Sequence, residues 1–525
     1  MQKAASGQAG RSFLVPLAHG CPGTASNAGR PGCPLASFGP RQSSVLTFAL
    51  RPLLLFALLL GLAGCAAQVP PAPPVAPSPP PPAELRDIQT LPQDVAAYFD
   101  ALSLDRPLLS TRAQADMAAR LRELHFAPWH RAKPAHARAD ALWGLAGLKA
   151  NRHYGENLRP LGPEFRVQME ALCQAESYPN LMRPAIATAN TSLRVLPTQR
   201  PGFLKPDKPG EGYPFDYWQN SALLAGTPVL ATQLSADGAW VLVEGRVAPG
   251  WVSVRDIAFV DEAFMAQWES LPLAAITREG APVLASFADE AFPAAHLFAG
   301  RIGTLLPLLD TGVWGSGGDV SGAGGPTLLA PAREASGRAL SLAVRLNPDE
   351  AAPMPLPLTP RTYARLANQL MGQPYGWGGY LDNRDCSALL LDLYAPFGIF
   401  LPRNSRQQSR QGEWTPFGEL PPQAKEALLL ERGQPLLTLV YKPGPIMLYL
   451  GRKDGRAVIL HDVWGLRTKS EGGKEGRYVV GRVAITTVTP GAEVPEVVRS
   501  GLLLPTCEGM TNVGAPPRAV PPLAR

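Results

Sequence analysis

A cysteine lies where a glycine-rich aromatic run gives way to an apolar segment. The aromatic run covers residues 375–380, and Asp385-Cys386-Ser387 then opens an apolar segment that continues to Tyr394. This order predicts a thiol in the first turn of a buried helix. The helix dipole and the unpaired backbone N–H groups at that end favour the thiolate over the thiol.

Such a thiolate suits acyl transfer if a base lies within reach. His461 is the only histidine that follows His296, so it is the one imidazole available to this part of the chain. A lone cysteine is more often an inert buried thiol, and Cys386 by itself leaves that alternative open.

The composition describes several modest domains. The 525 residues include 57 prolines and 51 glycines, which argues against one large core. Five of the 49 basic residues lie before residue 66, where no acidic residue occurs, so 44 basic residues face 43 acidic ones in the remainder. This near balance gives no electrostatic reason to expect a nucleic-acid partner.

Residues 1–65 are predicted to be a leader with a lipoprotein signal peptide. Its apolar core begins at Leu53, is too short to span a bilayer and has the length of a signal-peptide core. It ends in Leu62–Cys65, which resembles a bacterial lipobox, so Cys65 is the expected lipidation site. The alternative is an ordinary signal peptide with a chance cysteine. The lipobox predicts a lipid-anchored protein on the periplasmic side of a bacterial membrane, and Ala66 favours the outer membrane.

Residues 66–84 are expected to form an extended, proline-rich tether between the membrane and the rest of the chain. Apart from Cys65 and the leader, the cysteines are Cys173, Cys386 and Cys507. An odd number leaves at least one free thiol. A Cys173–Cys507 disulfide stays an open alternative in an exported protein.

Residues 85–190 indicate a mainly helical and irregular N-terminal domain. The clearest helix is Arg112–Leu124, where apolar residues recur at helical spacing. His125, His130 and His136 follow, with no carboxylate or thiol at metal-ligand spacing. They are interpreted as solvated or capping histidines, and neither a metal nor a cofactor is expected.

Two small β-barrels are predicted next, over 191–262 and 263–350. The first has short β runs separated by turn residues such as Asp237-Gly238. The second barrel has a weaker series of short β runs, which a glycine-rich loop interrupts. The runs of the first barrel are 192–195, 228–232, 240–243 and 250–254.

Prolines mark a linker before the domain that carries the thiol, residues 356–495. This domain is predicted to combine helices with an antiparallel sheet, so the fold class is α+β. Residues 496–525 form a tail that is expected to be poorly ordered. The expected elements are a helix over 362–371, a hairpin of 446–450 and 457–461 with its turn at Asp454-Gly455, and a strand over 478–487.

Residues 356–490 resemble the NlpC/p60 cysteine peptidases, because five motifs agree with that family in order and spacing. The upstream layout resembles the subgroup with an N-terminal clip domain and two bacterial SH3-like barrels. The motifs are Tyr375-Gly376-Trp377-Gly378-Gly379, Asp385-Cys386-Ser387, Leu401-Pro402-Arg403-Asn404-Ser405, Gln408 and Gly444-Pro445-Ile446-Met447-Leu448-Tyr449-Leu450-Gly451.

The resemblance implies a papain-like α+β core that cleaves peptidoglycan stem peptides, usually between D-glutamate and the diamino acid. Cys386 matches the nucleophile, and His461 matches the polar position that normally orients the base. Tyr375, Asn404 and Ser405 match positions that hold the free amino end of the stem peptide beside the first barrel.

Asp385 and Ser387, on either side of the thiol, complete the substrate-binding set that the resemblance implies. The chain departs from the family at two positions. Pro445 stands where the family carries its catalytic histidine, and it offers no proton acceptor. Asn404 stands where relatives often have aspartate, and it loses the charge-assisted part of a bond to an ammonium group.

The hairpin predicts where His461 stands relative to these positions. A turn near Asp454 places Met447 opposite His461, with Pro445 a diagonal neighbour on the same face, about 7–8 Å away between Cα atoms. A base needs a heavy-atom distance of about 2.6–3.2 Å to the thiol, or one bridging water. We therefore expect the His461 imidazole to enter the cleft without direct contact with Cys386, while a water relay stays open.

Three functions are compatible with these residues. The first is a membrane-anchored cysteine endopeptidase that cuts peptidoglycan stem peptides through Cys386. The second, which Pro445 and Asn404 motivate, is a catalytically impaired protein that binds cell-wall peptides without cutting them. The third is acyl transfer on another substrate.

Overall fold

The computed structural model describes residues 84–286, 294–311 and 324–515. The predicted leader, Cys65 and the tether up to residue 83 lie outside the described residues, as does most of the glycine-rich loop of the second barrel. Residues 82–525 form one compact unit. In the described part of the chain, no helix combines the length and the apolar character needed to cross a bilayer.

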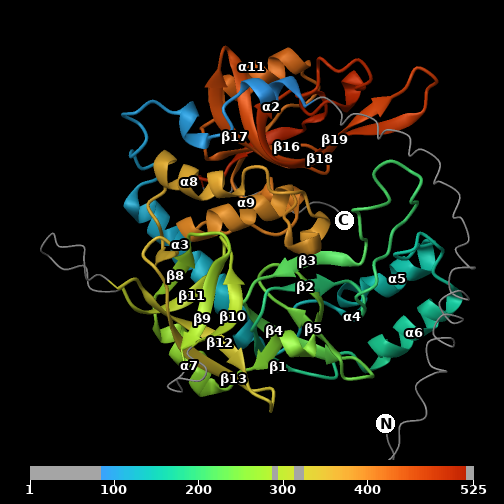
Figure 1. Cartoon of the computed structure of the whole chain (residues 1–525), viewed down its shortest axis with the longest axis vertical. Helices are drawn as coiled ribbons and strands as arrows, with labels where there is room; N and C mark the ends of the chain where they lie inside the picture. Colours follow the sequence, from blue (N-terminus) through green and yellow to red (C-terminus); the bar gives the residue numbers. More distant parts are fainter. Residues whose placement is uncertain (1–83, 287–293, 312–323, 516–525) are drawn as a thin grey trace, which may run out of the picture. The chain divides into compact units, whose positions relative to one another are not determined.

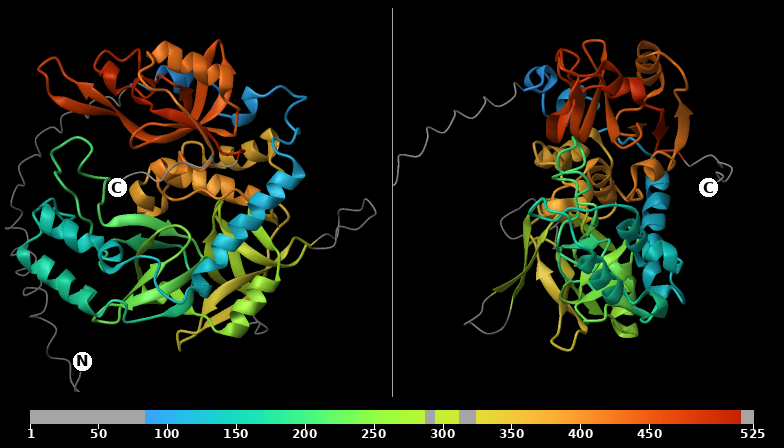
Figure 2. Two further views of the ribbon diagram at one scale, coloured as in Figure 1. Left: turned by 180° about the vertical axis from the view of Figure 1, so that it is seen from behind. Right: turned by 90° about the vertical axis from the view of Figure 1, so that its right-hand side faces the viewer.

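The N-terminal region is helical and irregular. Its longest helix, α3 (Thr111–Phe126), contains the predicted Arg112–Leu124, and the Ser110 hydroxyl caps it by accepting from the Ala113 amide at 3.2 Å. Figure 2 shows α3 running beside the second β unit, where Arg122 donates to the carbonyl of Glu269. The other helices are α2 (Arg86–Thr90), α4 (Arg138–Ala141), α5 (Trp143–Ala150) and α6 (Pro163–Cys173).

The three histidines of this region have separate surroundings. His130 Nε2 lies 2.6 Å from Glu269, and His136 Nδ1 lies 2.9 Å from Glu244. His125 is only 1% exposed, so the interpretation as a solvated or capping residue is wrong for it. Burial lowers the pKa of His125, which therefore stays neutral inside the core.

The first β unit is a seven-stranded antiparallel sheet with the order β3-β2-β6-β5-β4-β1-β7. It begins at Arg183, upstream of the expected boundary at residue 191. The predicted Asp237-Gly238 turn joins β4 to β5, and Gly238 has a φ of +68° that favours glycine. The strands are β1 (Arg183–Ala187), β2 (Thr191–Arg194), β3 (Gln219–Leu223), β4 (Pro228–Leu234), β5 (Trp240–Glu244), β6 (Pro249–Ser253) and β7 (Ile257–Phe259).

The second β unit follows α7 (Glu262–Ser270) and consists of a five-stranded sheet, β13-β12-β11-β8-β14, and a hairpin, β9-β10. Its strands are β8 (Leu273–Ile276), β9 (Ala281–Ser286), β10 (Ala294–Gly300), β11 (Leu305–Asp310), β12 (Thr327–Arg333), β13 (Ala339–Arg345) and β14 (Ala351–Pro353).

The last domain is a six-stranded antiparallel sheet, β15-β20-β16-β17-β18-β19, with helices on both faces. Figure 1 shows α9 against one face of this sheet, and α11 with α2 against the other. The helices are α8 (Pro360–Ala367), α9 (Cys386–Tyr394), α10 (Ser405–Gln408) and α11 (Pro422–Arg432). The strands are β15 (Glu413–Pro416), β16 (Thr438–Tyr441), β17 (Ile446–Lys453), β18 (Arg456–Lys469), β19 (Glu475–Thr487) and β20 (Gly509–Asn512).

The predicted hairpin is confirmed. Asp454 and Gly455 both have positive φ values, 48° and 79°, as the two central residues of a type I′ turn require. Lys453 pairs with Arg456, and Leu448 pairs with Leu460 farther along the strands. The predicted α+β fold class is likewise the one observed.

The expectation of a poorly ordered tail is wrong for residues 496–515. Strand β20 lies between β15 and β16, where Thr438 pairs with Asn512 and Thr415 with Met510. Met510 is buried and packs in the core on the α11 side of the sheet. A short strand of this kind is held by partners far away in the sequence, so its own residues carry little signal.

Cys173 and Cys507 do not form the disulfide that the sequence left open. Both are free thiols, and they belong to different hydrophobic clusters, one beside the first β unit and one beside α11. Cys507 Sγ donates to the carbonyl of Leu503 at 3.3 Å. Burial raises the pKa of each thiol to about 12, so both are unreactive structural residues.

Candidate active site

The thiol occupies the predicted position at the start of α9. Cys386 is the first residue of the helix, is partly exposed, and follows the capping residue Asp385. The Asp385 carboxylate accepts from the Ala388 amide at 2.9 Å and from the Gly378 amide at 3.1 Å. The helix start is therefore fixed from both sides.

The glycine-rich run brings the backbone against the first β unit. At Gly378, φ is +62°, and a Cβ atom would lie 2.4 Å from the carbonyl oxygen of Gln219 on β3. At Gly379, a Cβ atom would lie 2.8 Å from the Cβ of Ala222. Only glycine fits this approach, so the run positions the thiol beside the first barrel.

Arg403 holds the residues on either side of the thiol. Its guanidinium donates to Asp385 at 2.6 Å, to the Ser387 hydroxyl at 2.8 Å and to the Ser221 hydroxyl of β3 at 2.9 Å. The predicted substrate-binding side chains of Asp385 and Ser387 are thus engaged within the protein and position the helix start. Sequence analysis included Arg403 in a motif but gave it no role.

The surroundings of Cys386 oppose ionisation. Burial raises the pKa of the Cys386 thiol to about 12, and the neighbouring carboxylates of Asp385 and Asp462 act in the same direction. A hydrogen bond from the Ile446 amide and the charge of Arg403 act the other way without offsetting these effects. The prediction that the helix terminus favours the thiolate is wrong for this site, because desolvation and like charge outweigh the dipole.

His461 lies on the face of the sheet that packs against α11. On β18, Ile459 belongs to that core, and His461 contacts Thr486 on the same face at 3.0 Å through Nε2. The expectation that this imidazole enters the cleft is therefore wrong, because Cys386 packs on the opposite face of the sheet. Burial lowers the pKa of His461 to about 4, so the ring is neutral at physiological pH.

The protonation of the His461 ring follows from its partner. The Thr486 hydroxyl donates to the carbonyl of Thr487 at 2.8 Å, so it accepts from His461 Nε2. Nδ1 then carries the lone pair, and it is buried without a partner among the described residues. Buried polar atoms normally have a hydrogen-bond partner, so Nδ1 of His461 lacks a hydrogen-bond donor that such an atom would usually have.

Pro445 directly precedes β17, and the amide of the next residue, Ile446, forms a hydrogen bond with Cys386. The register that pairs Leu448 with Leu460 places Met447 opposite His461. The Pro445 carbonyl accepts from the Lys442 amide at 3.2 Å, and Ser405 donates to the adjacent Gly444 carbonyl at 2.8 Å. Proline is tolerated there because a strand start needs no N–H donor.

Asp462 is a site residue that sequence analysis missed. It pairs with Val483 and lies on the α9 face of the sheet, is fully buried, and has no partner for either oxygen in the described chain. Burial and the charge of Asp385 raise the pKa of Asp462 well above its usual range. The available signal was strand alternation, since Leu460 and Asp462 must share a face.

Replacing Asp462 with asparagine is expected to lower the pKa of Cys386, because the substitution removes a negative charge that opposes thiolate formation. The rate of iodoacetamide alkylation against pH would show its midpoint shifted to lower pH. The matched control is Asp454→Asn, in an exposed turn, which should leave the midpoint in place. An unchanged midpoint in Asp462→Asn would contradict this view of the site.

An aromatic group borders the thiol. The Tyr375 ring lies 6.4 Å from Phe215 of the first β unit and 5.8 Å from Trp464, between ring centroids. Burial, Asp385 and Cys386 raise the pKa of the Tyr375 hydroxyl well above its usual range, so it stays a neutral donor. The predicted Tyr375 therefore lies beside Cys386.

Asn404 and Ser405 lie at the start of α10. The Asn404 side chain caps this short helix by accepting from the Arg406 amide at 2.9 Å, and the residue is exposed. Ser405 reaches the loop that contains Pro445 through its bond to Gly444. Both residues have structural contacts, and their predicted role in substrate binding stays a prediction.

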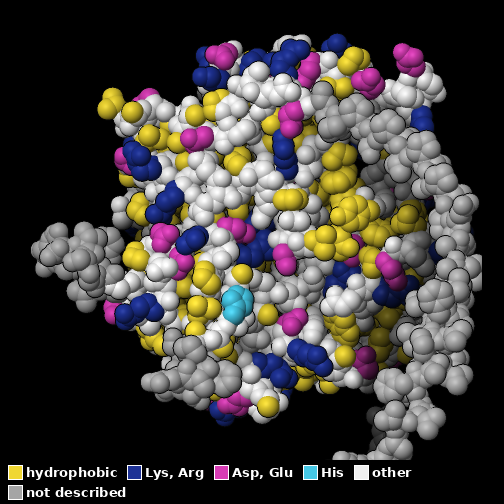
Figure 3. Space-filling model, in the orientation of Figure 1, with side chains coloured by type: hydrophobic (Ala, Val, Ile, Leu, Met, Phe, Trp, Pro, Cys, Tyr) yellow, Lys and Arg dark blue, Asp and Glu magenta, His cyan; other side chains and the backbone are white. Residues whose placement is uncertain are grey.

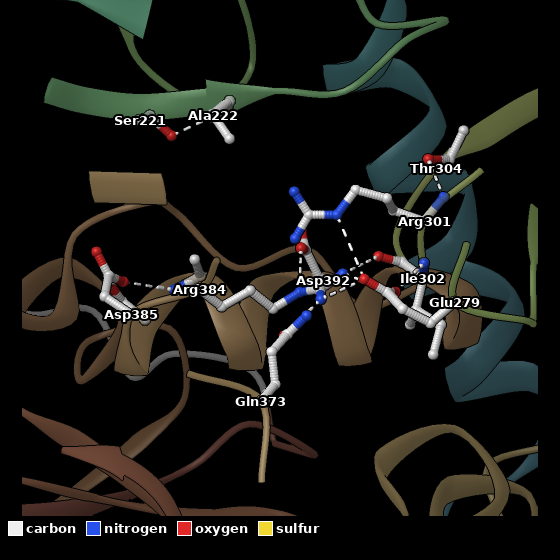
Figure 4. A network of polar contacts seen from close by, with 12 residues as sticks. Ser221, Ala222, Glu279, Arg301, Ile302, Thr304, Gln373, Arg384, Asp385 and Asp392 are labelled. Carbon is white, nitrogen blue, oxygen red and sulfur yellow. Dashed lines mark hydrogen bonds and ion pairs between the residues drawn. The ribbon is translucent and has the colours of Figure 1, made fainter. Parts of the chain in front are cut away.

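A buried polar network supports α9 from below (Figure 4). Arg384, which is 1% exposed, donates to Asp392 of α9 at 2.8 Å and to Glu279 of the second β unit at 2.7 Å. It also donates to Gln373 at 2.9 Å. The network ties the second β unit to the helix that carries the thiol.

On the face shown in Figure 3, Lys and Arg side chains are interspersed with Asp and Glu. The described residues likewise hold no group of three His, Cys, Asp or Glu side chains close enough for a metal ion.

Three segments of the chain match known protein-family models. Residues 53–178 match the NLPC_P60 N-terminal stabilising domain, residues 201–253 match an SH3 domain of the SH3b1 type, and residues 372–452 match the NlpC/P60 family. The last match includes Cys386 and Pro445 and ends before His461. None of the curated proteins matches the chain.

The fold agrees with that of a solved structure. A novel NlpC/P60 endopeptidase from Photobacterium damselae subsp. piscicida is 25% identical, with a TM-score of 0.72 over 82% of this chain and 98% of that one. An NlpC/P60 family protein from Bacillus cereus is 18% identical over 63% of this chain and 99% of that one, and its TM-score of 0.40 carries no argument. The chain therefore contains a domain of the NlpC/P60 family, whose members are cysteine peptidases, together with the stabilising N-terminal domain and the SH3 domain of such proteins.

Proposed function

We propose that this protein is a slow cysteine endopeptidase that cleaves peptidoglycan stem peptides between D-glutamate and the diamino acid. The observation that carries the proposal is a partly exposed Cys386 at the capped start of α9, beside Tyr375, in a chain of the NlpC/P60 family. The scissile bond is the usual one of the family subgroup that the sequence resembles.

The reaction needs one proton acceptor. The thiol gives up its proton, Sγ bonds to the carbonyl carbon, and the C–N bond breaks as the leaving amine takes a proton. Water then hydrolyses the thioester and restores the thiol. His461 does not supply the proton acceptor, because this residue lies on the α11 face of the sheet, away from Cys386, and burial lowers its pKa to about 4. Slow turnover follows from the lack of a positioned base and from the unfavourable ionisation of Cys386.

A second candidate function is binding of cell-wall peptides without cleavage. The unfavourable ionisation of Cys386 and the position of Pro445 support it. Such a protein would use Tyr375 and the loop around Ser405 to hold the peptide, and it would not need the thiol.

We further propose that the protein is a lipoprotein on the periplasmic side of a bacterial membrane, with the outer membrane favoured. The support is the lipobox-like Leu62–Cys65 and the tether that follows. Cys65→Ala should move the protein from the membrane fraction to the soluble fraction. An unchanged membrane fraction would contradict lipidation at Cys65.

The test of the catalytic function is hydrolysis of purified stem tri- and tetrapeptides under reducing conditions, followed by mass spectrometry. We expect slow release of the dipeptide L-Ala-D-Glu by the unaltered protein and none by Cys386→Ala. The matched control is Cys507→Ala, which removes a buried thiol on the other side of the sheet and should leave turnover in place. Peptide binding that persists in Cys386→Ala without any turnover in the unaltered protein would favour the binding function instead.

A further inference from the structure

A cavity lies between the first β unit and the helix that carries the thiol. It contains about 450 Å³ of space that no protein atom fills, its mouth included. The first β unit contributes Ser221, Thr227 and Arg246, and the other walls come from the second β unit and α9. Figure 4 shows Arg301 extending into the gap between β3 and α9.

Four arginines line this cavity, Arg246, Arg301, Arg384 and Arg403, against one lining carboxylate, Asp392. Three of the four arginines have acidic partners. The ion pairs are Arg384 with Glu279 at 2.7 Å and with Asp392 at 2.8 Å, Arg403 with Asp385 at 2.6 Å, and Arg301 with Glu279 at 3.4 Å. The four arginines therefore carry one more positive charge than the three carboxylates neutralise.

Arg246, on the β5–β6 connection, is the arginine without a partner. In the described chain it makes neither a hydrogen bond nor an ion pair, and its Nε is shielded from solvent. Its charged or titratable neighbours are Asp392, which Arg384 already binds, and the neutral His125. Arg246 is half-buried and its guanidinium has no counter-charge of its own, so the folded chain leaves one positive charge to be neutralised.

We propose that this cavity is a binding site for a small oxyanion, a carboxylate or a phosphate, with Arg246 as its main ligand. The planar fork of a guanidinium matches two oxygens of either group. The Ser221 and Thr227 hydroxyls add neutral polar groups to the same wall. The anion would connect the first β unit to the peptidase domain, because Arg246 comes from one and Arg403 from the other.

The site would communicate with the thiol through Arg403. This residue lines the cavity and also donates to Asp385 and Ser387, which flank Cys386. A bound anion adds negative charge beside a cation that favours the thiolate, so it should slow alkylation of Cys386. This inference does not depend on peptidase activity.

The experiment measures thermal unfolding of the full chain in phosphate, acetate or chloride at one ionic strength. Phosphate or acetate should raise the Tm of the unaltered protein with saturation, whereas chloride should not. Arg246→Met should weaken the response at least about tenfold, because the charge-assisted bonds are lost. Arg452→Met, at an exposed position on β17, is the matched control and should respond like the unaltered protein.

The two anions distinguish the source of the ligand. A stronger response to acetate indicates a peptide carboxylate, and a stronger response to phosphate indicates a free phosphate. Arg246→Met removes an unpaired, half-buried charge and should fold. Arg246→Lys, which keeps the charge without the planar guanidinium, should respond with intermediate strength. Equal responses of Arg246→Met and the unaltered protein, or no difference from chloride, would overturn the proposal.

Discussion

Pro445→His should raise the rate of stem-peptide hydrolysis by about 10²–10⁴-fold, the usual contribution of a positioned general base. Position 445 directly precedes Ile446, whose amide forms a hydrogen bond with Cys386. An imidazole at 445 would therefore lie next to the thiol and take its proton. The measurement is kcat/KM on a stem tripeptide.

Two controls separate this explanation from a general effect of replacing proline. Pro445→Gln supplies polar atoms without a base and should stay as slow as the unaltered protein. His461→Ala, added to Pro445→His, should keep the gain, because His461 lies on the opposite face of the sheet from the thiol. A gain of similar size in Pro445→Gln, or none in Pro445→His, would show that another feature of the site limits the rate.

The hairpin shows what the sequence alone could predict. Asp454-Gly455 specifies a two-residue turn, and that turn sets the register of β17 against β18. Asp462 was missed because β18 is buried on both faces from Ala457 to Val463, so alternation of polar and apolar residues does not reveal the face that each side chain occupies.

The ionisation of Cys386 was predicted in the wrong direction for a physical reason. The prediction considered the dipole at the start of α9 and left out the charge of the capping residue. Asp385, which caps α9, places a carboxylate next to the thiol. Long-range partners explain the remaining omissions. Strand β20 depends on β15 and β16, and the acidic partners of Arg384 come from α9 and from the second β unit, which no local pattern connects.

Arg384→Met should lower the free energy of unfolding by about 3–5 kcal/mol, the range seen when one partner of a buried ion pair is removed. Methionine keeps much of the side-chain volume, so the loss is mainly electrostatic. Glu279 and Asp392 would stay in place without the guanidinium that now binds both, and the carbonyl of Ile302 would lose a donor at 3.0 Å. Urea unfolding followed by tryptophan fluorescence measures the change.

The pH dependence of that loss tests its electrostatic origin. Burial alone would raise the pKa of Glu279, but Arg384 and Arg301 hold this pKa below its usual value. The Glu279 carboxylate therefore stabilises the unaltered protein above the unfolded-state pKa of about 4.3, and this contribution is lost as pH falls. In Arg384→Met the stabilisation by Arg384 is absent at every pH, so the difference between the two proteins should narrow as pH approaches 4. Arg361→Met, which breaks an exposed pair with Asp105, is the matched control and should change stability little. A deficit that stays constant with pH would point to lost packing instead of unpaired charge.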